Sequence, residues 1–182
     1  MSEALFAGDL DAGSHRESTG ELAPAAAAAA VARALVERGQ TLATAESLTG
    51  GLVAATLVEI PGVSAVFRGG LVVYATDLKH DLAGVSAALL RERGPVDPQV
   101  ARELAAGVRD RCGADWGLAT TGVAGPDPQD GKPVGLVFVA VVGPAGEEIR
   151  ELRLGGSRAE IRSRTVTAVL QLLTGALHRP SA

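Results

Sequence analysis

Apolar and polar positions alternate along this chain in periods that predict a regular succession of helices and strands. A proline suited to a first helical turn and the alanine run after it favour a helix over 24–38, ended by Gly39. The segment 41–47, TLATAES, predicts a short strand, and the segment 48–62 predicts a helix stopped by a Pro-Gly pair. Ser47 therefore lies at a strand-to-helix junction.

The rest of the chain continues this alternation and ends with a hairpin pattern. The further predicted elements are a strand within 69–76, a short helix from Asp77, a helix from Pro98 to Cys112 capped by Asp97, strands at 116–122, 135–143 and 147–156, and a helix at 157–177. The last two strands are joined by the turn GPAGE, which favours an antiparallel pair. We therefore expect an α/β fold, a three-layer α/β/α sandwich with a mixed, mostly parallel sheet.

Length and composition predict one folded unit. The 182 residues, 47% of them hydrophobic, suffice for one well-filled core over 23–180, whereas 1–22 lack periodicity and predict a flexible N-terminal extension. The start of the chain is too polar for a secretory signal, and no apolar run of about 18 residues is present. The single cysteine, Cys112, cannot form an internal disulfide. We expect a cytoplasmic protein without a membrane partner.

The charge balance excludes one large class of partners. Lysine and arginine number 17 against 21 aspartates and glutamates, a net charge of -4, which is the wrong sign for a protein that binds nucleic-acid phosphates. Aromatic residues, at 3%, are too scarce for base-stacking platforms. A small-molecule substrate is the better expectation.

Candidate chemistry begins at Ser47, which a strand end would expose beside a glycine-rich turn. Gly50 and Gly51 allow a ligand to approach the backbone closely, and Thr49 lies between them and the serine. The amides of residues 48–51 are candidates for an oxyanion hole. The alternative is structural, with Ser47 or Thr49 acting only as the N-cap of the following helix.

A serine nucleophile needs a base, and the histidines are poorly placed for a Ser-His-Asp triad. His15 lies in the extension and His178 ends the last helix, so only His80 lies in the interior of the folded segment. Lys79 is the better candidate, because desolvation beside a cleft lowers a lysine pKa. Tyr74, five positions earlier, could relay a proton. A solvated lysine and a packing tyrosine are the structural alternatives.

Four segments, in this order, resemble the signature of the CinA C-terminal domain family: 45–85, 120–126, 132–141 and 155–166. The resemblance covers about residues 25–177. It implies a nucleophile at Ser47, with Tyr74 and Lys79 as the other two catalytic residues. The chain departs from the common pattern at Leu48, Thr76 and Ser157, where cysteine, asparagine and aspartate are usual.

The resemblance also implies an activity, the hydrolysis of nicotinamide mononucleotide to nicotinate mononucleotide and ammonia, with no cofactor. The phosphate of such a substrate needs N–H donors or arginine. The loop after the strand at 116–122 offers Thr121, Gly122 and Gly125, and Arg158 and Arg162 are one helical turn apart, so both could face one anion. As alternatives, the glycines only shape a turn, and the arginines are solvated or pair with Glu160.

Three further expectations complete the prediction. No HxxH, HExxH or clustered cysteines are present, so we expect no metal site and interpret Asp127 and Asp130 as turn residues. We expect a homo-oligomer. Two rival functions remain open, a Ser-Lys amidase for another carboxamide and a non-catalytic binding module associated with competence or DNA damage.

Overall fold

A mixed sheet of five strands forms the middle layer of the part of the chain that this computed structural model describes, residues 23–179. The strands are β1 Leu42–Glu46, β2 Phe67–Val72, β3 Trp116–Gly122, β4 Leu136–Gly143 and β5 Gly146–Arg153, and they lie in the order β2-β1-β3-β4-β5. The extension predicted over 1–22 lies outside the described residues.

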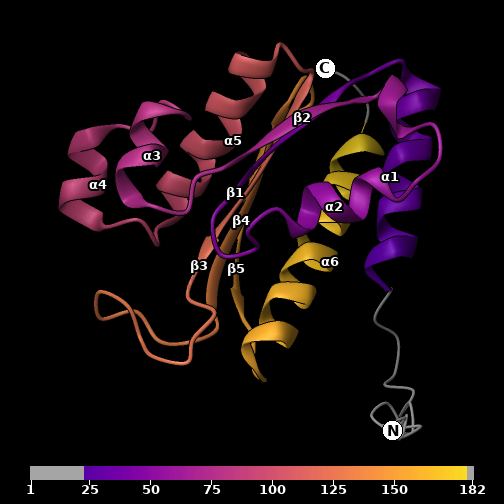
Figure 1. Cartoon of the computed structure of the whole chain (residues 1–182). Coiled ribbons are helices and arrows are strands. Elements are labelled where there is room, and N and C mark those ends of the chain that lie inside the picture. Colours follow the sequence, from indigo (N-terminus) through magenta and orange to yellow (C-terminus); the bar gives the residue numbers. More distant parts are fainter. Residues whose placement is uncertain (1–22, 180–182) are drawn as a thin grey trace, which may run out of the picture.

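Helices cover both faces of this sheet, which confirms the predicted sandwich (Figure 1). One face packs against α1 Pro24–Arg38, α2 Leu52–Val58 and α6 Arg158–Leu177. The other face packs against α3 Thr76–Asp81, α4 Ala87–Arg93 and α5 Pro98–Cys112. A 3₁₀ helix at Val63–Ala65 precedes β2. None of the helices within 23–179 is long and apolar enough to cross a membrane.

The sheet divides into a parallel half and an antiparallel half. Strand β1 pairs in parallel with β2 and with β3, whereas β4 pairs antiparallel with β3 and with β5. The expectation of a mostly parallel sheet is therefore correct only for the β2-β1-β3 half. The reason is that neither β3 to β4 nor β4 to β5 is connected by a crossover helix, and strands joined without one run antiparallel.

Small residues let α5 approach the sheet closely. A Cβ on Gly117 of β3 would lie 1.9 Å from the carbonyl oxygen of Ala105, so only glycine fits this contact. On the opposite face, β3 and β4 present larger side chains to α1 and α6, among them the buried Trp116, Leu118 and Val139. The α5 face also contains large side chains, among them Leu136 and Phe138 of β4, so the close backbone approach is confined to the contact at Gly117.

Most element boundaries agree with the sequence prediction because local capping signals specify them. Gly39 ends α1 in the left-handed conformation at φ 61°, and the Asp97 side chain accepts a hydrogen bond from the Gln99 amide at the start of α5. Two details differ. Strand β2 ends at Val72, so Tyr74 lies beyond it, and the helix α4 was not expected.

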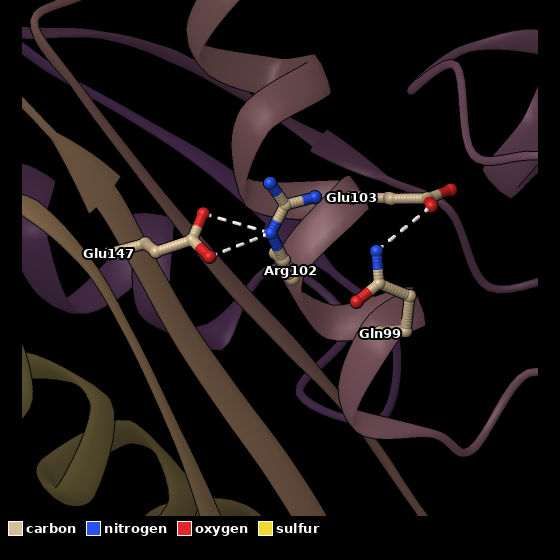
Figure 2. A network of polar contacts seen from close by, with 4 residues as sticks. All are labelled: Gln99, Arg102, Glu103 and Glu147. Atoms are coloured by element: carbon tan, nitrogen blue, oxygen red, sulfur yellow. Dashed lines mark hydrogen bonds and ion pairs between the residues drawn. The ribbon is translucent and has the colours of Figure 1, made fainter.

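A surface network links α5 to the antiparallel half of the sheet (Figure 2). The Arg102 Nε donates to both carboxylate oxygens of Glu147 on β5, at 2.9 and 2.8 Å, and this bonding raises the pKa of Arg102. Gln99 donates to Glu103 one turn along the same helix, at 3.3 Å. Both members of the Arg102–Glu147 pair are more than a third exposed, so the pair contributes at most about 1 kcal/mol to stability.

Candidate functional site

The candidate site lies where the three parallel strands end. Ser47 follows β1, Tyr74 lies two residues beyond β2, and Thr121 is at the end of β3. Because parallel strands bring their carboxyl ends to one edge, these residues meet there. The chain leaves β1 through α2 on one face and leaves the neighbouring strand β2 through α3 on the other, so the crevice at this edge is a topological switch point.

A cavity of about 130 Å³ occupies this crevice. Seven of the residues expected from the sequence line it: Ser47, Tyr74, Lys79, Thr121, Gly122, Gly125 and Arg158. The other four, Thr49, Gly50, Gly51 and Arg162, are not among its lining residues. The structure therefore brings all three expected catalytic residues to one cavity and divides the expected binding residues into two groups.

Ser47 presents its hydroxyl to the cavity. Its backbone amide donates to the carbonyl of Thr120 on β3 at 3.0 Å, which fixes the residue against the sheet. The side chain is 8% exposed and lines the cavity. Within residues 23–179 the Ser47 Oγ has no hydrogen-bond partner, so a ligand in the cavity can contact it without displacing another group.

Lys79 is buried, and its side-chain amine lies at the same cavity. The residue is 1% exposed, and Nζ donates to the carbonyls of Val73, Tyr74 and Ala75 at 2.8, 3.2 and 3.5 Å. Burial lowers the pKa of Lys79 from 10.5 to about 8, against an opposing effect of nearby Asp77. No hydrogen bond joins Lys79 to Ser47 among the described residues.

Arg158 crosses the mouth of the cavity. Its Nη2 donates to the Tyr74 hydroxyl at 3.0 Å, and its Nη1 donates to the Gly125 carbonyl at 2.6 Å. Tyr74 is 58% exposed, so its hydroxyl reaches the rim and not the core. Glu160, which was a possible partner for the arginines, instead forms a capping box with Ser157 at the start of α6. Arg158 thus joins α6 to both sides of the cavity mouth.

The turn after Ser47 depends on a residue that sequence reasoning missed. Glu46 is 1% exposed, and its carboxylate accepts hydrogen bonds from the amides of Gly51, Val53 and Ala54 at 2.8 to 3.0 Å. The alternative of an N-cap by Ser47 or Thr49 is therefore wrong, because the glutamate already binds the amides at the start of α2. An acidic residue directly before a glycine-rich helix start is the signal that could have revealed it.

Thr49 and Arg162 support the turn from behind. The Thr49 hydroxyl shares a buried hydrogen bond of 2.8 Å with the Thr120 hydroxyl on β3. Arg162 donates from Nε to the Leu48 carbonyl at 3.0 Å and from Nη2 to the Thr49 carbonyl at 2.7 Å. The two arginines expected to face one anion therefore contact different structures. Arg158 lies at the cavity mouth, and Arg162 binds the carbonyl side of the turn.

The amides of the turn are not equally available for an oxyanion. The Gly50 amide donates to the Ser47 carbonyl at 3.0 Å, and the Gly51 amide donates to Glu46 at 3.0 Å. The amides of Leu48 and Thr49 have no acceptor within the described range, 23–179. The candidate donors therefore narrow from four residues to these two. Gly50 and Gly51 instead shape the turn, because their positive φ values of 59° and 92° are readily adopted only by glycine.

The described histidines do not belong to the site. His80 contacts the Val85 carbonyl through Nδ1, His178 contacts the Thr174 carbonyl, and neither lines the cavity. His15 lies outside the described residues. Between residues 23 and 179 no group of three or more acidic, histidine or cysteine side chains is arranged to hold a metal ion. The candidate chemistry rests on Ser47, Lys79 and Tyr74.

Comparison with known proteins places these residues in a family. Residues 24–177 match the CinA C-terminal domain. A CinA-like protein of Frankia casuarinae is 52% identical over 139 residues, which is 76% of this chain and 32% of that protein. A CinA-like protein of Geobacter sulfurreducens is 50% identical over 144 residues, 79% of this chain and 34% of that protein. The chain thus spans about a third of the length of the curated relatives it matches.

Solved structures agree with this match. The competence/damage inducible protein CihA of Agrobacterium tumefaciens has a TM-score of 0.81 at 36% identity, over 96% of this chain and 99% of that one. The competence damage-inducible protein A (ComA) of Klebsiella pneumoniae has a TM-score of 0.84 at 31% identity, over 87% of this chain and 100% of that one. The names of these proteins state a link to competence and damage and no chemical reaction.

Proposed function

The chain belongs to the CinA C-terminal domain family, and from this premise we propose that it is an amidohydrolase that deamidates nicotinamide mononucleotide. One observation carries the proposal. A serine hydroxyl without a partner and a buried lysine with a pKa lowered to about 8 line the same small cavity. A lysine that loses its proton near pH 8, at the same cavity as a hydroxyl without a partner, supplies the base and the nucleophile that a Ser-Lys hydrolase requires.

In the proposed acylation step, neutral Lys79 accepts the proton of the Ser47 hydroxyl as Oγ forms a bond to the carboxamide carbon. The oxygen of the tetrahedral intermediate accepts hydrogen bonds from the Leu48 and Thr49 amides. The C–N bond then breaks, and the leaving nitrogen takes a proton from the Lys79 ammonium, either directly or through the Tyr74 hydroxyl, which gives up its own proton and takes the lysine proton in exchange. Lys79 is then neutral again. Ammonia departs and an ester on Ser47 remains.

Hydrolysis of the ester returns the enzyme to its starting state. Lys79 accepts a proton from water as the hydroxide oxygen attacks the ester carbon, and the same two amides stabilise the second oxyanion. The bond between the acyl carbon and Ser47 Oγ breaks, and Oγ recovers its proton from Lys79. The products are nicotinate mononucleotide and an unchanged serine.

The phosphate of the substrate would lie at the mouth of the cavity, next to Arg158. This arginine is exposed and lines the cavity. Its Nη1 and Nη2 make the two hydrogen bonds to Gly125 and Tyr74, and its Nε takes part in neither of them. The Thr121 hydroxyl donates to the Pro95 carbonyl at 2.7 Å, so Thr121 shapes the cavity wall. Gly122 and Gly125 also line the cavity, and glycine is needed there because a Cβ on Gly122 would lie 2.7 Å from the Leu136 carbonyl oxygen and one on Gly125 would lie 2.8 Å from the Val134 side chain.

Ammonia release from nicotinamide mononucleotide by the purified chain tests this proposal, with nicotinate mononucleotide measured by chromatography. We expect turnover in the wild type and a loss of about 10⁴-fold or more in Ser47→Ala, because removing a covalent nucleophile leaves only binding and the oxyanion hole. Circular dichroism should show that this variant folds normally.

Two results would separate the parts of the proposal. Hydrolysis of other carboxamides, without hydrolysis of nicotinamide mononucleotide, would contradict the named substrate and retain the Ser-Lys mechanism. Turnover of the mononucleotide by Ser47→Ala at the wild-type rate would contradict the covalent mechanism. The absence of hydrolysis with every carboxamide would favour the binding module instead.

A further inference from the structure

We propose that Arg162 is a positioning residue that aims the Thr49 amide into the cavity. The proposal rests on the proposed function, since it assigns the oxyanion donor for the reaction at Ser47. It replaces the expectation that Arg162 binds the substrate's anion. The observations that carry it are the hydrogen bonds on both sides of the turn after Ser47.

Two of these bonds come from one guanidinium group. Arg162 donates to the Leu48 carbonyl at 3.0 Å and to the Thr49 carbonyl at 2.7 Å, so it holds two consecutive peptide groups at once. Such charged, two-point contacts are shorter and stronger than bonds between neutral groups, and they restrict orientation as well as position. The side chain is partly buried and is not among the lining residues of the cavity.

The geometry of the peptide bond fixes the direction in which the Thr49 N–H bond points. In a trans peptide the C=O and N–H bonds point in opposite directions. Because Arg162 holds the Leu48 carbonyl on one side, the N–H of the same peptide group, which belongs to Thr49, must point to the other side. Leu48 lines the cavity, and the Thr49 amide has no acceptor among the described residues. We assign this N–H, on the side of the turn away from Arg162, to the cavity.

The next peptide group obeys the same rule and provides an internal check. Arg162 holds the Thr49 carbonyl, so the Gly50 amide must point away from Arg162, and it donates to the Ser47 carbonyl at 3.0 Å. Glu46 then binds three amides further along the turn. One cation on the carbonyls and one anion on the amides therefore fix the whole turn, and they leave the Leu48 and Thr49 amides available.

Steady-state kinetics of Arg162→Lys and Arg162→Gln distinguish positioning from anion binding. A misaligned oxyanion donor weakens the transition state and not the bound substrate, so we expect kcat to fall about 100-fold with KM changed less than about threefold. The fall should be the same for nicotinamide riboside, which lacks the phosphate. Arg150→Gln, on the outer strand β5 and paired with Glu148, is the matched control and should retain wild-type kinetics.

A raised KM with unchanged kcat, confined to the phosphorylated substrate, would overturn the proposal in favour of an anion contact. Chemical rescue provides a further readout. Guanidinium ion at a non-denaturing concentration should restore part of the kcat of Arg162→Ala, and a purely structural defect would not respond in this way. Circular dichroism of the conservative variant Arg162→Lys checks that the fold is intact.

The NMR signal of the Thr49 amide tests the same inference without turnover. In Arg162→Lys its chemical shift should move, together with that of Gly50, because both peptide groups lose the guanidinium. Thr49 and Gly50 signals that stay in place would overturn the positioning role. A wild-type protein that releases no ammonia from any carboxamide would contradict the proposed function alone, and the amide signals would then still decide the role of Arg162.

Discussion

The two walls of the cavity are built in opposite ways. The inner wall consists of Ser47, Leu48 and Lys79, all buried, and the turn that carries the serine is held by Glu46 and Arg162. The outer wall is the loop 123–135, whose residues Asp127 and Gln129 are exposed and whose backbone is held at the mouth by Arg158. In Figure 1 this loop extends beyond the end of β3 and has no helix or strand of its own.

The difference shows where precision is needed. Covalent chemistry requires the hydroxyl, the amine and the oxyanion donors to keep their positions within a fraction of an ångström, and buried, charged hydrogen bonds provide this. Recognition of a ribose and a phosphate tolerates more movement, and an exposed loop can adapt to the ligand. Substitutions on the inner wall should therefore affect kcat or stability, whereas those at the outer wall should affect KM.

The largest effect that we expect is a fall in kcat when Lys79, on the inner wall, is replaced. Lys79→Met keeps the bulk of the buried side chain and removes the base, so we expect kcat to fall about 10³-fold or more, because general-base catalysis contributes roughly 10² to 10⁴. The other lysine in the sequence, Lys132 on the outer loop, is a matched control. Lys132→Met should stay within about twofold of the wild-type kcat, and equal losses in both variants would contradict the division.

The wild-type pH profile tests the same base without a mutation. Because burial lowers the pKa of Lys79 to about 8, the amine is protonated below that pH and cannot accept a proton from Ser47. We expect kcat/KM to rise about tenfold per pH unit up to about pH 8 and to level off above it. A profile that is flat between pH 6 and 9 would rule out Lys79 as the base.

The next effect is on stability and compares two acids. Glu46→Gln replaces a buried carboxylate that binds three amides with a group that has one acceptor oxygen, so we expect a loss of about 2 to 3 kcal/mol in the free energy of unfolding. Asp127→Asn on the exposed loop should change it by less than about 0.5 kcal/mol. Urea unfolding measures the free energy of unfolding of both variants. Similar losses in the two would show that the hydrogen bonds of Glu46 do not stabilise the inner wall more than the exposed loop is stabilised.

The smallest effect is expected at the cavity mouth. Arg158→Gln removes a positive charge and two hydrogen bonds between exposed groups, so we expect KM for nicotinamide mononucleotide to rise about tenfold, equal to about 1.4 kcal/mol, with kcat nearly unchanged. The rise should disappear with the riboside, which has no phosphate. A fall in kcat with unchanged KM would contradict this prediction and would indicate that Arg158 acts in catalysis and not in substrate recognition.

Element positions could be predicted from the sequence where local signals decide them. The ends of α1 and α5 follow from Gly39 and Asp97, and β3 lies at the predicted residues because its apolar run is bounded by turns. The short helix α4 was missed, since seven residues between loops give little periodicity. The balance of parallel and antiparallel pairs was also missed, because strand pairing depends on connections across the whole sheet.

The candidate site was predicted as a set of residue types and not as an arrangement. Ser47, Tyr74 and Lys79 could be named because they lie close together in the sequence and in a family pattern. The contacts of Arg162 could not, because Arg162 lies more than 100 positions from the carbonyls that it binds. Glu46 was missed although its contacts are local, with the amides at the start of the next helix. Spacing on α6 made Arg158 and Arg162 look like a pair, whereas the packing of α6 against the turn gives them separate partners.

The sequence by itself determined the succession of helices and strands, the acidic charge balance, and the serine, tyrosine and lysine that a hydrolytic mechanism would use. These depend on side-chain chemistry and local periodicity, which neighbouring residues specify. Only the tertiary structure decided that Lys79 is buried, that two amides of the turn are free, and that one arginine supports the turn while the other borders the cavity. Burial and hydrogen-bond direction depend on residues far apart in the chain, so no local pattern contains them.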